Sequence, residues 1–309
     1  MKKLYCASIL LIVFCNTSCI NLDLYYLEDF DKAMFTTFED YYFELLNNNS
    51  YTSADMQMLK ENYTKHVARI AKNKKPILYN ETVTIPKVIH QIWLGSRPPE
   101  ELKKLQKTWI DLHPDWDFKV WTEADLEAFD LINKESFKNA VNYGEKANIW
   151  RYEILYRFGG LYVDVDFECL KPFDLLHHWC DFYTGIHELK WISGHEKGDK
   201  LTCCNALIGS RPGHPILKAL IDTMKDYVHE KDQFHRNGVF YFGDTVKKLL
   251  TSCDGVNVIF PQNYFYAWGK KNDGPYKWVQ QETMAIHHFS GLWKKPMKKG
   301  HKKLRVSLK

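Results

Sequence analysis

The sequence predicts an α/β domain with a mostly parallel central sheet, and two kinds of segment indicate it. Apolar runs typical of strands occur at residues 88–94, 118–121 and 161–167. Segments with apolar residues at helical spacing separate them, at residues 99–112 and 145–158. Strands that alternate with helices are typical of parallel sheets, because each helix carries the chain back to begin a neighbouring strand in the same direction.

The chain divides into a leader, a stem, a domain and a tail. Residues 4–22 carry no charge and follow two lysines, so we interpret residues 1–22 as a signal peptide or a signal anchor. Residues 23–83 contain apolar residues at helical spacing, and we expect a helical stem packed loosely against the domain. Residues 84–293 form the predicted catalytic domain, and residues 294–309 a basic tail.

The leader and the glycosylation motifs favour the secretory pathway. The lysines before the leader would keep that end in the cytosol and send the rest across a membrane. The Asn-x-Ser/Thr motifs all precede the domain, as in a glycosylated lumenal stem, at Asn16, Asn48, Asn62 and Asn80. We expect a Golgi membrane protein with a lumenal catalytic domain, with a secreted protein as the alternative.

Charge and cysteine content argue against a nucleic-acid-binding protein and against a structural zinc site. The net charge of +4 is concentrated in the basic tail, which argues against a nucleic-acid surface. Disulfides are possible among the domain cysteines, but no Cys-x-x-Cys pair indicates structural zinc. These cysteines are Cys169, Cys180, Cys203, Cys204 and Cys253.

The helix at residues 145–158 places a charge among apolar side chains. Its apolar arc consists of Ala147, Trp150, Ile154, Leu155 and Phe158. Arg151 falls inside this arc, whereas Glu145 and Tyr152 lie outside it. A guanidinium directed into a core needs an anionic partner, either a structural carboxylate or a ligand phosphate. Gly159 and Gly160 end the helix.

The next strand carries the candidate chemistry. Residues 161–167 alternate at the strand period, which predicts that Tyr162, Asp164 and Asp166 share one face. Two carboxylates spaced in this way can hold one hard cation, Mn²⁺ or Mg²⁺, although many solvated strands carry such pairs without a metal. Arg151 would then be a second clamp on a metal-bound diphosphate.

Four ordered segments make the sequence resemble glycosyltransferase family 32. They are residues 85–93, His113-Pro114-Asp115-Trp116, residues 151–172 with the Asp-x-Asp motif, and residues 285–293. The family includes yeast Golgi and inositol-phosphoceramide mannosyltransferases and is distantly related to the glucosylating domains of clostridial toxins. The resemblance implies a GT-A type fold and a metal-dependent, retaining hexosyltransferase. Its partners would be a UDP- or GDP-hexose donor and a glycan, glycolipid or protein acceptor.

The resemblance also implies roles for single residues. Trp93 would lie at the nucleotide base and Trp293 over the donor sugar or diphosphate, while Arg151 and Tyr162 would line the donor site. Asp166 and Asp164 would bind the metal with His288, for which His287 is the alternative. The family usually has Ser-Asp-Ile-x-Arg where this chain has Asn148 in place of the aspartate. Asn148 can bond a sugar hydroxyl but carries no charge.

Two other functions remain as alternatives. A metal-dependent phosphohydrolase also uses paired aspartates, but we find no further cluster of metal ligands in sequence around Asp164. A carbohydrate-binding protein could keep the fold without turnover, and the change at Asn148 is the feature that favours it.

Overall fold

The structure is a computed structural model that describes residues 26–35, 53–72, 83–95, 97–187, 201–267 and 276–291. The leader, the basic tail, Trp293 and the glycosylation motifs at Asn16, Asn48 and Asn80 lie outside these residues. Among the helices that are described, none is both long and apolar enough to cross a bilayer.

A six-stranded sheet forms the centre, in the order β2-β1-β3-β6-β5-β7. Its strands are β1 (Val88–Ile92), β2 (Asp117–Trp121), β3 (Gly160–Val163), β5 (Phe182–Ile186), β6 (Cys203–Ser210) and β7 (Asn257–Phe260). Strand β6 runs antiparallel to both neighbours, and the other pairs are parallel. The predicted α/β class with a mostly parallel sheet is therefore confirmed. A second sheet pairs β4 (Phe167–Cys169) with β8 (Ala285–His287).

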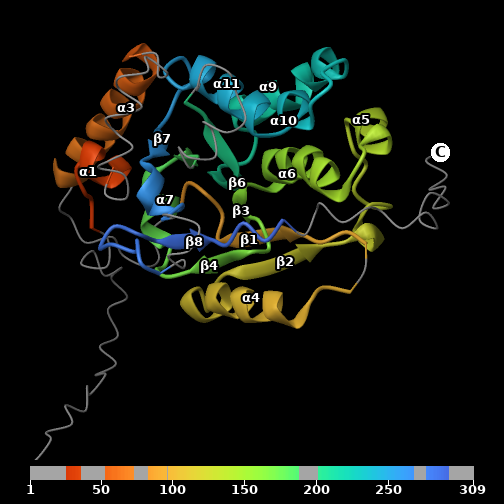
Figure 1. The fold of residues 1–309 in the computed structure, drawn as a ribbon, viewed down its shortest axis with the longest axis horizontal. Coiled ribbons are helices and arrows are strands. Elements are labelled where there is room, and N and C mark those ends of the chain that lie inside the picture. Colours follow the sequence, from red (N-terminus) through yellow and green to blue (C-terminus); the bar gives the residue numbers. More distant parts are fainter. Residues whose placement is uncertain are drawn as a thin grey trace, which may run out of the picture.

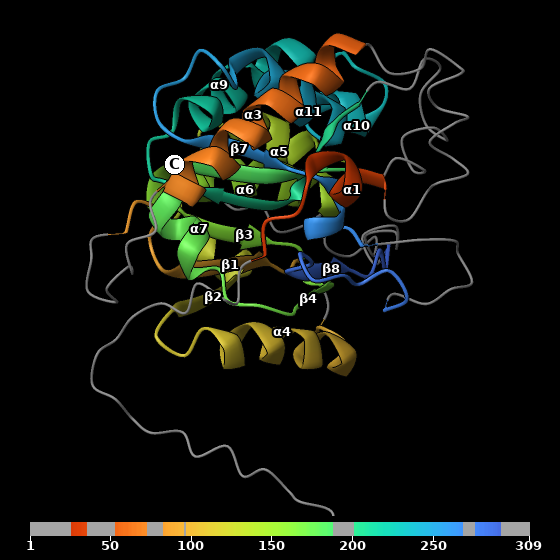
Figure 2. The ribbon, with the colours of Figure 1, turned by 90° about the vertical axis from the view of Figure 1, so that its left-hand side faces the viewer.

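Helices flank the sheet (Figures 1 and 2). In both views the strands follow one another from β2, near α4 (Glu100–Leu112), to β7, near α3 (Ser53–Lys72). Helices α6 (Tyr143–Phe158), α9 (Pro215–Thr223) and α11 (Val239–Leu249) cluster at the α3 end. The shorter helices are α1 (Phe30–Phe35), α5 (Lys134–Asn139), α7 (Asp174–Trp179) and α10 (Gln233–Arg236).

The two helices before the domain pack into its core. Phe30 and Met34 of α1, and Leu59 and Tyr63 of α3, are each at most 2% exposed. The Tyr63 hydroxyl lies 2.6 Å from that of Tyr264. Loose packing of this stretch was therefore a wrong expectation, because periodicity alone did not reveal how deeply the aromatic residues are buried.

The Asn62 side chain is also used in this packing. Its Nδ2 donates to the Asn257 carbonyl at 2.8 Å, and its Oδ1 accepts from the Ile259 amide at 3.2 Å. A glycan on Nδ2 would disrupt the first of these bonds to β7. The folded state therefore disfavours modification at this motif.

The predicted strand at residues 161–167 is not continuous. Asp164 still bonds to β6, with its amide donating to the Ala206 carbonyl at 2.8 Å. The chain then turns, and the Phe167 amide donates to the Asp164 carbonyl at 3.1 Å. Asp164 and Asp166 therefore lie in a turn between two sheets and do not share one strand face.

Helix α6 is fixed at both ends. The Asn142 side chain accepts from the Glu145 amide at 2.9 Å, which satisfies a free donor of the first turn. Gly159, at φ 64°, ends the helix. A Cβ on Gly160 would lie 2.6 Å from the Val88 carbonyl oxygen, so β1 and β3 approach as closely as they do because this residue is glycine.

The domain cysteines are free thiols. Cys169, Cys180, Cys203, Cys204 and Cys253 each lack a disulfide partner within the described part of the chain. The first four are buried, and burial raises their pKa, so they remain protonated at neutral pH. They therefore contribute to the core as small apolar side chains.

Buried histidines predict a loss of stability in mild acid. Burial lowers the pKa of His66, His90 and His214 to about 4. The unfolded chain binds these protons near pH 6.5, so it holds more protons than the folded protein between pH 6.5 and 4, and stability falls as the pH is lowered through this window. We expect each histidine to contribute roughly 1 kcal/mol of destabilisation at pH 5.5.

Urea unfolding at pH 7.5 and 5.5 measures this loss. His66→Phe is a suitable variant, because neither ring nitrogen of His66 has a hydrogen-bond partner among the described residues and its ring packs edge-on against Phe260. The variant should lose less stability between the two pH values than the parent. An identical loss would show that His66 does not contribute to the pH dependence.

Candidate active site

The candidate site lies where parallel strands end. Trp93 follows β1, and Asp164 follows β3, which pairs with β1 in parallel. Both residues therefore lie at the carboxyl edge of the sheet, where α/β folds bind ligands. Trp93 is half-buried, and its amide donates to the Trp121 carbonyl at 2.9 Å.

His90 connects this edge to the turn that precedes β3. Its Nε2 lies 2.9 Å from the Gly159 carbonyl, and Trp121 Nε1 donates to its Nδ1 at 3.1 Å. Because the carbonyl can only accept, Nε2 carries the proton and the ring is neutral. His90 is therefore a structural residue that joins β1, β2 and the end of α6.

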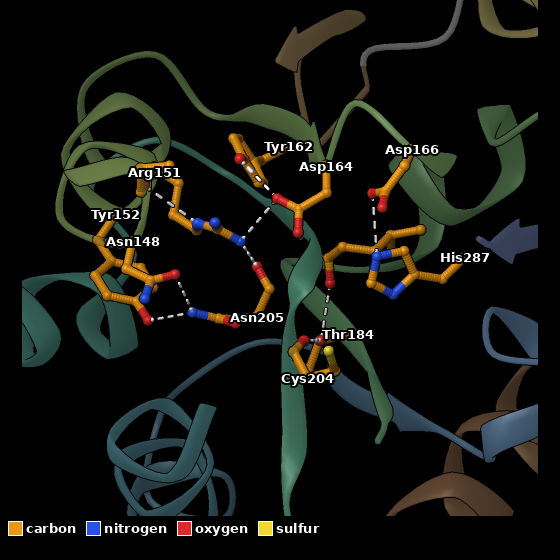
Figure 3. A network of polar contacts seen from close by, with 12 residues as sticks. Asn148, Arg151, Tyr152, Tyr162, Asp164, Asp166, Thr184, Cys204, Asn205 and His287 are labelled. Carbon is orange, nitrogen blue, oxygen red and sulfur yellow. Dashed lines mark hydrogen bonds and ion pairs between the residues drawn. The ribbon is translucent and has the colours of Figure 1, made fainter. Parts of the chain in front are cut away.

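Arg151 from α6 meets Asp164. Its Nη1 lies 3.2 Å from Asp164 Oδ1 and donates to the Asn205 carbonyl at 2.6 Å (Figure 3). The guanidinium carbon lies 4.4 Å from the centre of the Tyr162 ring. Burial opposes the charge on Arg151, but the facing Asp164 carboxylate raises its pKa above the usual value. Of the two anionic partners considered for Arg151, the structure contains the carboxylate.

Asp164 also accepts a hydrogen bond from a neighbouring tyrosine. The Tyr162 hydroxyl donates to its Oδ1 at 2.9 Å. Burial raises the pKa of the Asp164 carboxyl, and Arg151 opposes this effect. Burial also raises the pKa of Tyr162 well above its usual value, so the phenol keeps the proton that it donates.

The turn from His287 to Ser290 surrounds Asp166. His287 Nε2 lies 3.1 Å from Oδ1, and both the amide and the hydroxyl of Ser290 donate to Oδ2, at 2.8 and 2.7 Å. The His288 amide donates to the Asp166 carbonyl at 3.0 Å. Burial alone would raise the pKa of Asp166, but His287 and these hydrogen bonds hold it below the usual range.

The structure brings His287 to the aspartates in place of His288. Ligand atoms of Asp164, Asp166 and His287 all lie within 4.8 Å of one another. His288 instead places Nε2 3.0 Å from Glu168 Oε2, on the other face of the β4–β8 pair. The expectation that favoured His288 depended on its spacing to Gly291, whereas the pairing of His287 with Phe167 in β4 decides which ring faces Asp166.

These residues fit a divalent cation. Two carboxylates and an imidazole offer the oxygen and nitrogen donors that suit Mn²⁺ or Mg²⁺. Within the part of the chain that the structure describes, His287 Nδ1 is buried without a hydrogen-bond partner, so these residues leave the ring incompletely satisfied.

Asn148 lies on α6, one turn before Arg151. Its Oδ1 accepts from Asn205 Nδ2 at 3.1 Å (Figure 3). Its Nδ2 lies 3.3 Å from Asn237 Oδ1. Sequence reasoning identified Asn148 but missed Asn205, Asn237 and Ser290. Ser290 lies inside the motif at residues 285–293 and could have been noted there. Asn205 and Asn237 carry no local signal, because only the fold brings them to α6.

Known proteins resemble the chain over these segments. Residues 99–183 match the family model described as "Glycosyltransferase sugar-binding region containing DXD motif". "Inositol phosphoceramide mannosyltransferase 1" of Schizosaccharomyces pombe is 30% identical over 237 residues, which cover 69% of this chain and 71% of that protein. "Inositol phosphoceramide mannosyltransferase 3" of the same organism is 32% identical over 152 residues. That match covers 48% of this chain and only 39% of the relative.

A solved structure is also similar. The "PaToxG Glycosyltransferase" superposes with a TM-score of 0.46 at 14% identity. The match covers 64% of this chain and 79% of that one.

Proposed function

We propose that this chain transfers a hexose from a nucleotide sugar to an acceptor, because it belongs to the family of glycosyltransferases whose sugar-binding region contains a DXD motif. The observation that carries this proposal is the cluster of Asp164, Asp166 and His287 at the carboxyl edge of the sheet, beside Arg151. The names of the relatives support mannose as the sugar and an inositol-containing sphingolipid as the acceptor.

Asp164, Asp166 and His287 would hold Mn²⁺ or Mg²⁺. A cation held there supplies charge stabilisation for the diphosphate that leaves the sugar. Arg151 is directed by Asp164 and the Asn205 carbonyl, so its guanidinium is already oriented to bind phosphate oxygens. The amide and the hydroxyl of Ser290 both donate to Oδ2 of Asp166, so Oδ1 is the oxygen that faces His287.

Further groups complete the proposed donor site. Trp93 provides a half-buried aromatic surface for the nucleotide base at the end of β1. Asn148 would bond a hydroxyl of the sugar, and Trp293 would cover the sugar or the diphosphate. The family resemblance implies that the anomeric configuration is retained. NMR of the product distinguishes retention from inversion by the coupling of the anomeric proton.

The proposed setting is the Golgi membrane. Residues 1–22 would anchor the chain with the domain in the lumen, where it would encounter both a nucleotide sugar and a membrane glycolipid. Mass spectrometry of the mature amino terminus tests this directly. An intact Met1 or its immediate neighbour supports the anchor, whereas an amino terminus near residue 22 shows a cleaved signal peptide.

A donor panel tests the reaction. We expect Mn²⁺-dependent hydrolysis or transfer with one member of a set of GDP- and UDP-hexoses, and an increase in rate when an inositol-containing sphingolipid is added. Turnover of no donor would reject the transferase. Metal-dependent nucleotide binding without turnover would favour the carbohydrate-binding alternative. Hydrolysis of simple phosphate esters at a similar rate would favour a phosphohydrolase.

The two neighbouring histidines provide a direct test of the metal ligands. His287→Ala removes a proposed ligand, so the Kd for Mn²⁺ should rise at least about tenfold. His288→Ala is the matched control, since it removes an imidazole that contacts Glu168 on the opposite face, and its Kd should stay within about threefold. Calorimetric titration of each variant with Mn²⁺ measures both. The opposite pattern would make His288 the ligand.

A further inference from the structure

A chain of polar contacts extends from the candidate donor site to a buried acid at the start of α6. Glu145 is 2% exposed and accepts from the Val141 amide at 2.7 Å, from Asn237 Nδ2 at 3.2 Å and from Arg236. Asn237 contacts Asn148, which contacts Asn205. The contacts of Asn205 with Asn148, Tyr152 and Arg151 are visible in Figure 3.

The charge on Glu145 fixes the direction of every bond in this chain. A carboxylate paired with a guanidinium can only accept, so Asn237 must direct its NH₂ group to Glu145. Its Oδ1 then faces Asn148, which must donate a hydrogen bond from its own NH₂ group. Asn148 Oδ1 is left to accept from Asn205. No other arrangement of the three amides satisfies all of these contacts.

An aspartate at position 148 would not fit this arrangement. Its carboxylate would face Asn237 Oδ1, placing two acceptors together without a proton between them. If the Asn237 amide turned over, its oxygen would face Glu145 instead. Either way the added negative charge leaves one buried acceptor contact unsatisfied, and such a contact is costly in a poorly solvated site.

We propose that Glu145 and Asn237 select an amide at position 148 and make it a fixed, uncharged hydrogen-bonding group of the donor site. This rests on the proposed function, since it assigns Asn148 to a hydroxyl of the donor sugar. The amide keeps one N–H and one lone pair beyond its contacts with Asn237 and Asn205. Glu145 and Asn237 are positioning residues. In this proposal, the asparagine that replaces the family's usual aspartate takes part in donor binding and does not indicate lost activity.

Four variants test this dependence: Asn148→Asp, Glu145→Gln, the double variant and Asn148→Ala. Asn148→Asp should lower kcat/KM for the donor at least about tenfold, chiefly by raising KM, and should lower the Tm. With Glu145→Gln, the NH₂ group of residue 145 can donate to a reversed Asn237 amide once Arg236, which bonds the same Oε1 and also contacts the Glu230 carbonyl, gives up that bond. Adding Asn148→Asp to that background should therefore cost at most about threefold. The proposal is overturned if Asn148→Asp keeps parental activity, or loses the same factor in both backgrounds.

Controls separate charge, folding and function. Asn139→Asp adds the same charge at an exposed position on α5 and should leave KM and Tm unchanged. Should the Glu145→Gln variants not fold, the Tm of Asn148→Asp is compared with that of Asn148→Ala, which removes the amide without adding charge. A Tm of Asn148→Asp at or above that of Asn148→Ala overturns the proposal. These Tm measurements remain decisive even if the parent turns over no donor, so failure of the proposed function is recognised separately.

Discussion

Asp166→Asn should lower kcat/KM by about 100- to 1,000-fold, because the cation would lose a charged oxygen ligand at the point where charge develops. The amide has nearly the same shape as the carboxylate. Its oxygen can still accept from the Ser290 amide and hydroxyl, while its NH₂ group faces His287. We therefore expect the fold to persist and the loss to reflect the metal site. Donor turnover and the Kd for Mn²⁺ are measured together, and the Kd should rise in parallel.

The matched control is Asp117→Asn. Asp117 is exposed at the start of β2, so its variant has the same change of charge and should keep parental turnover and Mn²⁺ affinity. Parental activity in Asp166→Asn would remove this residue from the reaction. Lost activity with unchanged Mn²⁺ binding would instead assign Asp166 to substrate positioning.

Local patterns predicted the elements that carry the site. The apolar run after Pro86 became β1, and the helical spacing from Leu102 to Leu112 became α4. The glycines at 159 and 160 ended α6 as predicted. Each of these features depends on residues close in sequence, because the spacing of apolar side chains and the conformational freedom of glycine are local properties of the chain.

Features that depend on distant partners could not be predicted in the same way. The pattern at residues 161–167 reads as one strand, because both halves alternate correctly. Only the separate pairing of β3 with β6 and of β4 with β8 reveals the turn at Asp164 and Asp166. That turn brings ligand atoms of both carboxylates and of His287 within 4.8 Å of one another.

Helix α6 shows the same limit in its polar residues. Glu145 and Tyr152 lie outside its apolar arc, and an amphipathic helix would expose both. They are 2% and 0% exposed, because segments far away in sequence supply Asn205, Asn237 and Arg236 as partners. The hydrophobic pattern of a single helix assigns every polar side chain to solvent, so it cannot reveal a buried polar network.

Arg151→Met should combine a large loss of donor affinity with a loss of stability. The guanidinium meets Asp164 and the Asn205 carbonyl and lies against the Tyr162 ring, so its removal leaves a partly buried carboxylate without its cation. We expect the free energy of unfolding to fall by roughly 2–4 kcal/mol. The Kd for the nucleotide diphosphate, measured with Mn²⁺ present, should rise about 100-fold because a phosphate clamp is lost.

Arg151→Lys separates charge from geometry. Lysine keeps the positive charge beside Asp164 but cannot reproduce the planar fork or its stacking on Tyr162. We expect this variant to recover most of the stability and only part of the nucleotide affinity. Arg69→Met is the control, since Arg69 is exposed on α3 and should affect neither quantity strongly. If Arg151→Met lost stability while nucleotide affinity stayed at the parental value, Arg151 would be a structural partner of Asp164 alone, and the diphosphate would have to be bound by other groups.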